Sequence, residues 1–310
     1  MFISLLYTKI KVNVNISSKG VYILSKFLLS AFADEIDACL PKQMEVLGSH
    51  SISFIEMRGV NGKNISEYTP DQVRSIKRQL DSENFRISAI GSPIGKIMIT
   101  DDFEPHFRLF QNLLDTAEIL ETRYMRIFSF FIPKDADPAI YRSPVIGRME
   151  KLVSAAEKRG ITLLHENEKD IYGDTAERCL DILESINSRF LRATFDPANF
   201  IQCGVNPYPV AYRLLKEHIE YIHIKDALFS TGNVVPAGEG DGKIKELLCA
   251  LAESGYEGFL SLEPHLADFE GFQKLELRAG AAVNTGNDGE VKFSIAAEAL
   301  NKILEDVKHG

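Results

Sequence analysis

Short apolar runs recur along the chain, and amphipathic segments separate them. Most of these runs are bounded by turn residues and are apolar throughout, which is typical of parallel strands covered on both faces. They occupy eight segments, at residues 28–33, 52–57, 86–91, 123–129, 161–166, 191–196, 220–225 and 258–263. We therefore predict eight buried parallel strands.

The segments between these runs predict helices. Thr69, followed by proline, is a helix N-cap, Gly160 and Gly255 each follow a helical pattern as C-caps, and a final amphipathic helix is expected over 295–307. Eight strand–helix alternations over residues 28–310 match an α/β protein of the (β/α)8 (TIM) barrel class in count and size. A doubly wound open sheet is the competing fold, but no Gly-x-Gly-x-x-Gly follows the first strand.

Two long loops follow the last two predicted strands. Residues 229–242 are rich in Gly, Val and Pro, and residues 269–290 indicate a hairpin with its turn at 284–289. Loops at the C-terminal face of a barrel usually shape the substrate pocket. The Gly-rich segment 238–242 is acidic and lacks the Lys-Ser/Thr of a phosphate loop, so we expect a lid or a turn.

Residues 1–27 contain no predicted barrel strand and are expected to be an N-terminal extension. Ala31-Phe32-Ala33 before Asp34 resembles a signal-peptidase site. However, the apolar stretch at 27–33 is barely long enough for a signal core and matches a first barrel strand. We therefore expect the domain to begin near Leu28 and the protein to be cytoplasmic.

Net charge, apolar runs and cysteine spacing indicate which kinds of binding partner and structural site to expect. The 310 residues carry a net charge of −9, which argues against DNA or an anionic membrane as the main partner. No apolar run reaches the about 18 residues of a membrane span. The four cysteines are scattered without a Cys-x-x-Cys pair, which fits reduced thiols rather than a disulfide frame or a zinc knuckle.

A potential metal ligand stands at the end of each of the last four predicted strands: Glu166, Asp196, His223 and Glu263. Parallel strands linked by helices bring their C-terminal ends to one face of the sheet, so these side chains can converge. Each alone has an ordinary explanation as a salt bridge, a turn former or a core residue. Three carboxylates at equivalent strand ends favour a site. Their excess predicts Mn²⁺ or Mg²⁺, with Co²⁺ or catalytic Zn²⁺ as alternatives.

Five further polar residues near strand ends are candidate substrate contacts: Glu56, Lys96, Asn199, Lys225 and His265. Lys225 lies two residues after His223 and therefore points to the same side of its strand, and Lys96 could hold an anionic group. Glu56 and Lys96 could equally be part of a salt bridge at the barrel mouth, and Asn199 could orient a ligand or a substrate hydroxyl.

Other polar residues carry weaker signals. Arg126 and Ser129, on the fourth strand, are as consistent with a supporting role as with a substrate contact. His106, His165 and His218 lack such context and are expected on the surface or on helices.

Five motifs, in chain order, resemble the xylose isomerase-like sugar phosphate isomerase/epimerase superfamily over about residues 28–310. They are Leu164-His-Glu-Asn167, Phe195-Asp-Pro-Ala-Asn199, His223-Ile-Lys-Asp226, Pro236-Ala-Gly-Glu-Gly-Asp-Gly242 and Leu262-Glu-Pro-His265. The resemblance implies a (β/α)8 fold and a divalent metal held by Glu166, Asp196, His223 and Glu263. In the ketose 3-epimerases of this superfamily, the two glutamates also move protons on opposite faces of an enediolate.

Two positions depart from those epimerases. They usually carry His where this chain has Asn199, and Arg where it has Phe229. The resemblance therefore implies the metal site of these epimerases for this chain, but not their substrate contacts. The superfamily also includes inosose dehydratases, other sugar lyases and endonuclease IV.

The leading hypothesis is a metal-dependent isomerase or epimerase of a small sugar, sugar phosphate or polyol ketone, with Glu166 and Glu263 as base and acid. A lyase or dehydratase shares the first proton abstraction and stays open. An endonuclease IV-like nuclease is disfavoured because strands two and three end in Glu56, Ser92 and Lys96, without histidine. A barrel that binds sugar without turnover is the fourth alternative. The expected partners are a small sugar or polyol and, in a homo-oligomer, further copies of the chain.

Overall fold

Eight parallel strands close into a barrel, in the order β1-β12-β9-β8-β7-β6-β5-β2. The computed structural model describes residues 27–266 and 288–309. The barrel strands are β1 (Leu28–Ala31), β2 (Phe54–Met57), β5 (Arg86–Gly91), β6 (Tyr124–Ile127), β7 (Thr162–Glu166), β8 (Leu191–Phe195), β9 (Ile219–Ile224) and β12 (Phe259–Leu262). Each lies within or overlaps a predicted segment, so the (β/α)8 prediction is confirmed.

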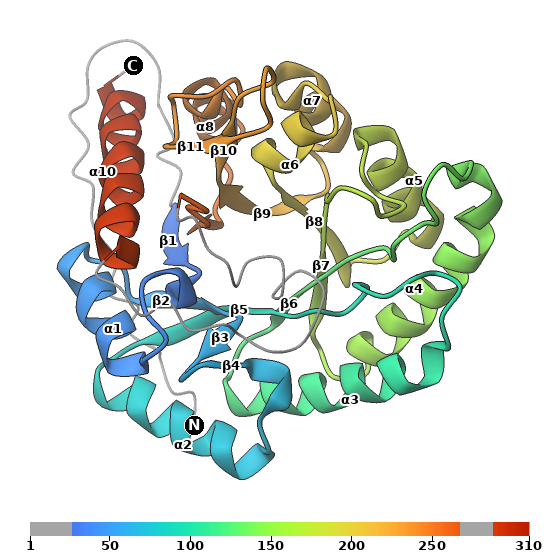
Figure 1. Ribbon diagram of the computed structural model, residues 1–310, viewed down its shortest axis with the longest axis horizontal. Helices are drawn as coiled ribbons and strands as arrows, with labels where there is room; N and C mark the ends of the chain where they lie inside the picture. Colours follow the sequence, from blue (N-terminus) through green and yellow to red (C-terminus); the bar gives the residue numbers. More distant parts are fainter. Residues whose placement is uncertain (1–26, 267–287, 310) are drawn as a thin grey trace.

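Helices surround the barrel (Figure 1). They are α1 (Leu40–Ser49), α2 (Pro70–Ser82), α3 (Phe103–Ile119), α4 (Arg142–Glu157), α5 (Ala176–Ile186), α6 (Pro197–Gln202), α7 (Tyr212–Leu215), α8 (Ile244–Glu253) and α10 (Asp288–His309). Short helical turns cover Ala33–Glu35, Ile65–Glu67, Pro138–Tyr141 and Pro207–Ala211. As predicted, Thr69 caps α2: its side chain accepts the N–H of Gln72, and the Gln72 side chain accepts the N–H of Thr69.

Side-chain alternation along each strand divides the interior of the barrel into layers. Leu164 and Tyr221 pack together in the lower interior. Two residues further along the same strands, Glu166 and His223 occupy the next interior layer, toward the C-terminal ends. The two-residue period of the strands thus places the layer of Glu166 and His223 directly above a layer of large, mainly apolar side chains.

The final helix is longer than predicted. The expected hairpin at 269–290 is wrong at its end, because Asp288–Glu290 form the first turn of α10. A Cβ on Gly289 would lie 2.4 Å from the Ile36 carbonyl oxygen, so this glycine permits close packing rather than a turn. The rest of that hairpin and residues 1–26 of the expected extension lie outside the described residues.

None of the helices within 27–266 and 288–309 is long and apolar enough to cross a membrane. The four cysteines, Cys39, Cys179, Cys203 and Cys249, are free thiols in the structure.

The Gly-rich segment 238–242 is a turn wrapped around one carboxylate. Asp226, in the short strand β10 (Asp226–Ala227), accepts the N–H groups of Gly238, Gly240 and Gly242 at 2.8–3.1 Å, and that of Ala227 at 2.9 Å. A Cβ on Gly240 would lie 2.3 Å from Asp226 Oδ1. β10 also pairs with β11 (Val234–Val235), so Asp226 fixes the loop that follows β9.

Asp226→Ala is expected to lower the free energy of unfolding by about 2 kcal/mol or more, because several backbone N–H groups lose their acceptor. Glu239→Ala, an exposed change in the same loop, is the matched control and should change it by less than about 0.5 kcal/mol. Urea denaturation measures both values. Equal midpoints for the two variants would contradict this role of Asp226.

Candidate metal centre

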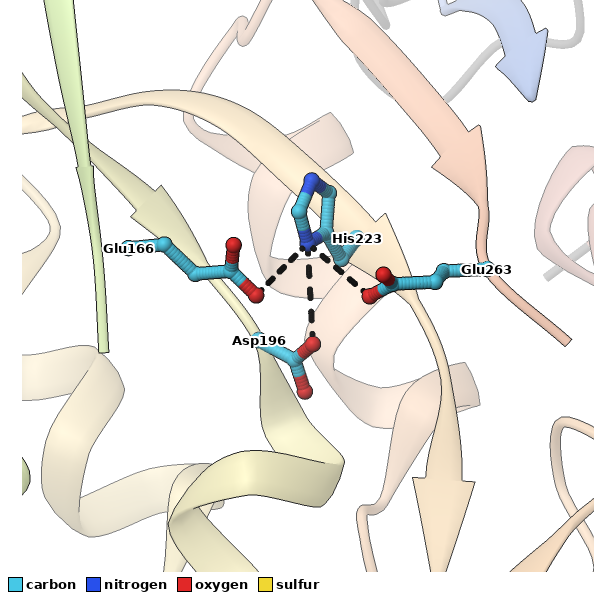
Figure 2. A group of neighbouring side chains, drawn as sticks. All are labelled: Glu166, Asp196, His223 and Glu263. Atoms are coloured by element: carbon cyan, nitrogen blue, oxygen red, sulfur yellow. Dashed lines mark hydrogen bonds and ion pairs between the residues drawn. The ribbon is translucent and has the colours of Figure 1, made fainter. Parts of the chain in front are cut away.

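The four side chains predicted as metal ligands meet at one point. Glu166, Asp196, His223 and Glu263 each offer a ligand atom, and these atoms all lie within 4.8 Å of one another. His223 Nδ1 faces the three carboxylates, at 3.2 Å from Glu166 Oε1, 3.4 Å from Glu263 Oε2 and 3.6 Å from Asp196 Oδ2 (Figure 2). All four residues are at most 2% exposed, so the cluster is inside the protein.

Strand ends and one helix cap set this geometry. Glu166 ends β7, His223 lies on β9, and Glu263 follows β12. Asp196 is the N-cap of α6, where its Oδ1 accepts the N–H of Asn199 at 2.8 Å. Asn167 holds the same turn, because its side chain hydrogen-bonds both the N–H and the carbonyl of Asp196.

Three cations surround the carboxylates. Arg126 Nη1 lies 3.1 Å from Glu166 Oε2, and Arg58 Nη1 lies 3.1 Å from Glu263 Oε1. Lys225 Nζ lies 2.8 Å from Asp196 Oδ2 and 3.0 Å from Glu263 Oε2.

These charges keep the glutamates ionised. Burial alone would raise the pKa of Glu166, but His223 and Arg126 outweigh it and lower that pKa to about 2. Burial likewise opposes ionisation of Glu263, yet Lys225 and His265 hold its pKa well below the ordinary value. Both glutamates are therefore anionic at neutral pH, as metal ligands need to be.

The cluster fits a divalent cation. Ligand atoms about 2.0–2.6 Å from one ion lie about 3–4 Å from one another, which is the spacing around His223 Nδ1. Within the described part of the chain, Glu166 Oε2 and Asp196 Oδ2 make no hydrogen bond of good geometry despite their burial. Three hard carboxylate oxygens and one imidazole nitrogen suit Mn²⁺, Mg²⁺, Co²⁺ or Zn²⁺.

Two predicted substrate contacts lie directly against this cluster. Asn199 donates from its side-chain nitrogen to Glu166 Oε1 at 3.1 Å and to the Asn167 carbonyl at 2.9 Å. Lys225 points inward beside His223, as the strand period predicts, and bridges Asp196 and Glu263. Both residues therefore contact carboxylates of the candidate metal centre.

Of the other three predicted contacts, His265 and Glu56 also touch members of the cluster, and Lys96 pairs with Glu168 instead. His265 Nε2 lies 3.1 Å from Glu263 Oε1 and close to Glu35 as well. Lys96 lies further out, with Nζ 3.4 Å from Glu168 Oε2. Glu56 is fully buried, and its Oε2 lies 3.2 Å from the second ring nitrogen of His223.

Sequence reasoning missed the contribution of the first two strands. Arg58, just after β2, binds Asp34 and Glu35, just after β1, and also reaches Glu263. Its guanidinium lies 4.4 Å from the centroid of the Phe32 ring. The sequence did contain a signal for these contacts. Charged residues follow the ends of β1 and β2, and those ends lie on the same face of the barrel as the predicted metal ligands.

One histidine assignment was wrong. His165, expected on the surface or on a helix, is 1% exposed on β7. Because Glu166 faces the interior of the barrel, its neighbour faces the other way, where Gly173 covers it. A Cβ on Gly173 would lie 2.4 Å from His165 Cε1.

The family follows from comparison with known sequences. The model of the xylose isomerase-like TIM barrel family matches residues 45–284. The chain belongs to this family. The resemblance carried by the five motifs is thereby confirmed at the level of the family.

One curated relative and two solved structures give further points of comparison. A curated relative, 2-epi-5-epi-valiolone 7-phosphate 2-epimerase from an Actinoplanes strain, is 25% identical over 63% of this chain and 71% of its own length. The solved D-psicose 3-epimerase from Clostridium cellulolyticum H10, with D-tagatose, has a TM-score of 0.69 at 14% identity, covering 90% of this chain and 99% of that one. The IOLI protein with a zinc atom gives 0.68 at 16% identity, with coverages of 91% and 99%. At these identities, the solved structures show the shared fold.

Adding Mn²⁺, Mg²⁺, Co²⁺ or Zn²⁺ to chelator-treated protein is expected to raise its melting temperature. At about 100 times Kd, a ligand of the native state stabilises it by about 2.7 kcal/mol. Asp196→Asn should abolish most of this shift, whereas Glu168→Gln, a carboxylate change beside the cluster, should retain it. Differential scanning calorimetry checks the shift. The same melting temperature with and without every one of the four metals would contradict the metal centre.

Proposed function

We propose that the protein is a metal-dependent isomerase or epimerase that acts on a small sugar, sugar phosphate or polyol ketone through an enediolate. The observation that carries the proposal is the placement of two buried, ionised glutamates on opposite sides of one cluster. Glu166 and Glu263 approach His223 from opposite directions in Figure 2, each with a carboxylate oxygen within 3.4 Å of Nδ1. A substrate carbon held between them would be open to proton transfer on both faces.

A divalent cation in this site would supply Lewis-acid polarisation of a carbonyl and the adjacent hydroxyl. The protein would supply the base and the acid. One glutamate removes the proton from carbon and can return the same proton to the neighbouring carbon. Return to the opposite face requires that the other glutamate first takes up a proton from solvent, which the removed proton later replaces. Burial of the site excludes water from the reacting carbon.

The supporting cations give the two glutamates different surroundings. Arg126 and the Asn199 amide hold Glu166, whereas Arg58, Lys225 and His265 hold Glu263. Both glutamates are fixed in direction, which favours proton transfer at defined positions.

Relatives support a carbon-centred proton transfer. The curated relative is an epimerase by name, and D-psicose 3-epimerase has the same fold. Asn199 departs from the histidine of ketose 3-epimerases, and its amide is engaged by Glu166 and Asn167. We therefore propose the same type of reaction for this protein, without the substrate contacts of the ketose 3-epimerases.

Glu166→Gln and Glu263→Gln are each expected to reduce turnover by about 10²- to 10⁴-fold or more, because each change removes a proton acceptor at nearly constant volume. Asn199→Ala and Lys225→Ala should impair turnover less, because they remove only supporting contacts. A screen of ketoses, inososes and 3-keto sugars in D₂O, with metal content measured in parallel, provides the assay.

The deuterium readout separates the alternatives. If each glutamate serves one face, a single Gln variant that still binds metal exchanges one substrate proton without completing the reaction. Near-wild-type activity in both metal-loaded Gln variants would rule out the two-carboxylate mechanism. Release of a dehydrated product by the wild-type protein would reassign the enzyme as a lyase.

A further inference from the structure

His223 has two ring nitrogens in two different environments. Nδ1 faces the three carboxylates, while Nε2 lies on the side of the ring away from them (Figure 2). Glu56 Oε2, from β2, lies 3.2 Å from that second nitrogen. Both side chains are 0% exposed. The imidazole is thus placed between a candidate metal centre and a separate buried carboxylate.

Burying the Glu56 carboxylate costs folding free energy. Neither of its oxygens has a hydrogen bond of good geometry within residues 27–266 and 288–309. A buried carboxylate without such a bond is destabilising, so the group requires a partner. His223 Nε2 lies 3.2 Å from Glu56 Oε2 and, within the same residues, also has no hydrogen bond of good geometry, so the two groups are the nearest match for each other.

The hydrogen bond at Nε2 decides what Nδ1 can do. In a neutral imidazole, one nitrogen carries the proton and the other carries the lone pair. A carboxylate that accepts the Nε2–H leaves the Nδ1 lone pair directed at Glu166, Asp196 and Glu263. Metal-binding histidines generally donate their other ring N–H in this way, which fixes both the tautomer and the direction of the ring.

Two aromatic rings pack against the same imidazole. The ring of Phe32 lies roughly perpendicular to that of His223, with the centroids 5.3 Å apart, and the ring of Tyr221 does so at 5.9 Å. Glu56 is buried behind His223, so it reaches the cluster through the imidazole and not from the solvent side.

We infer that Glu56 is a positioning residue that accepts the Nε2–H of His223 and so directs Nδ1 toward the metal centre. This inference rests on the metal centre of the proposed function. It gives Glu56 a role different from the substrate contact expected from its position at a strand end.

The test is Co²⁺ binding by the wild-type protein and by Glu56→Gln and Glu56→Leu. Gln keeps an oxygen that can accept the Nε2–H, whereas Leu removes the acceptor at similar volume. Ser88→Ala is the matched control, because Ser88 is a buried polar residue in the barrel that bonds to Ser30 and Tyr221 instead. Affinity is measured by competition with a chelator, and the visible absorption bands of Co²⁺ report its ligand geometry.

Glu56→Leu is expected to weaken Co²⁺ binding by about 10- to 100-fold and to shift the Co²⁺ bands. Glu56→Gln should retain most of the affinity, and Ser88→Ala should behave as the wild type does. Should the Leu variant not fold, Glu56→Ala removes the acceptor without adding bulk and is expected to show the same loss.

Two outcomes would overturn the inference. One is unchanged Co²⁺ affinity and absorption in the variant that lacks the acceptor. The other is an equal loss in the Gln and Leu variants, which would assign the effect to charge rather than to the accepted hydrogen bond. Because binding is measured without turnover, tight and Glu56-dependent Co²⁺ binding without substrate proton exchange would instead refute the proposed function alone.

Discussion

Mutual repulsion of buried carboxylates is the constraint on which this structure depends. Glu166, Asp196 and Glu263 present oxygens within 4.8 Å of one another in the buried interior of the barrel. Such a group of charges is unstable without cations close by. Arg126 and Lys225 supply part of the compensation at 2.8–3.1 Å, and a divalent cation facing His223 Nδ1 would supply the rest.

The same constraint explains how the barrel supports chemistry. The cations that stabilise the carboxylates also keep them ionised, because His223 and Arg126 lower the pKa of Glu166 despite its burial. An ionised glutamate that is fixed in direction and shielded from water can bind a cation and accept a proton from carbon. Under the proposed function, the residues that compensate the buried charge are also those that hold the two glutamates for proton transfer.

The sequence was informative where a local pattern determines position. Apolar runs located all eight barrel strands, and because parallel strands share one C-terminal face, the convergence of Glu166 and Glu263 could be predicted. The strand period also placed Lys225 beside His223. The family was likewise predictable from short motifs in order.

Contacts that depend on closure of the barrel could not be predicted in this way. The contact between Glu56 and His223 joins β2 to β9, and the contact between Arg58 and Glu263 joins the ends of β2 and β12. These partners are far apart in sequence, and no local pattern specifies the distance across the interior. The burial of His165 was missed for a related reason, since it depends on a loop whose path the strand period does not determine.

The most direct test of the central claim is diffraction from crystals grown with Mn²⁺, measured at a wavelength where manganese scatters anomalously. The account predicts a single strong anomalous peak about 2.0–2.6 Å from oxygens of Glu166, Asp196 and Glu263 and from His223 Nδ1. A fully Mn²⁺-equilibrated crystal with no peak among these atoms, and with Lys225 still bridging Asp196 and Glu263, would contradict it.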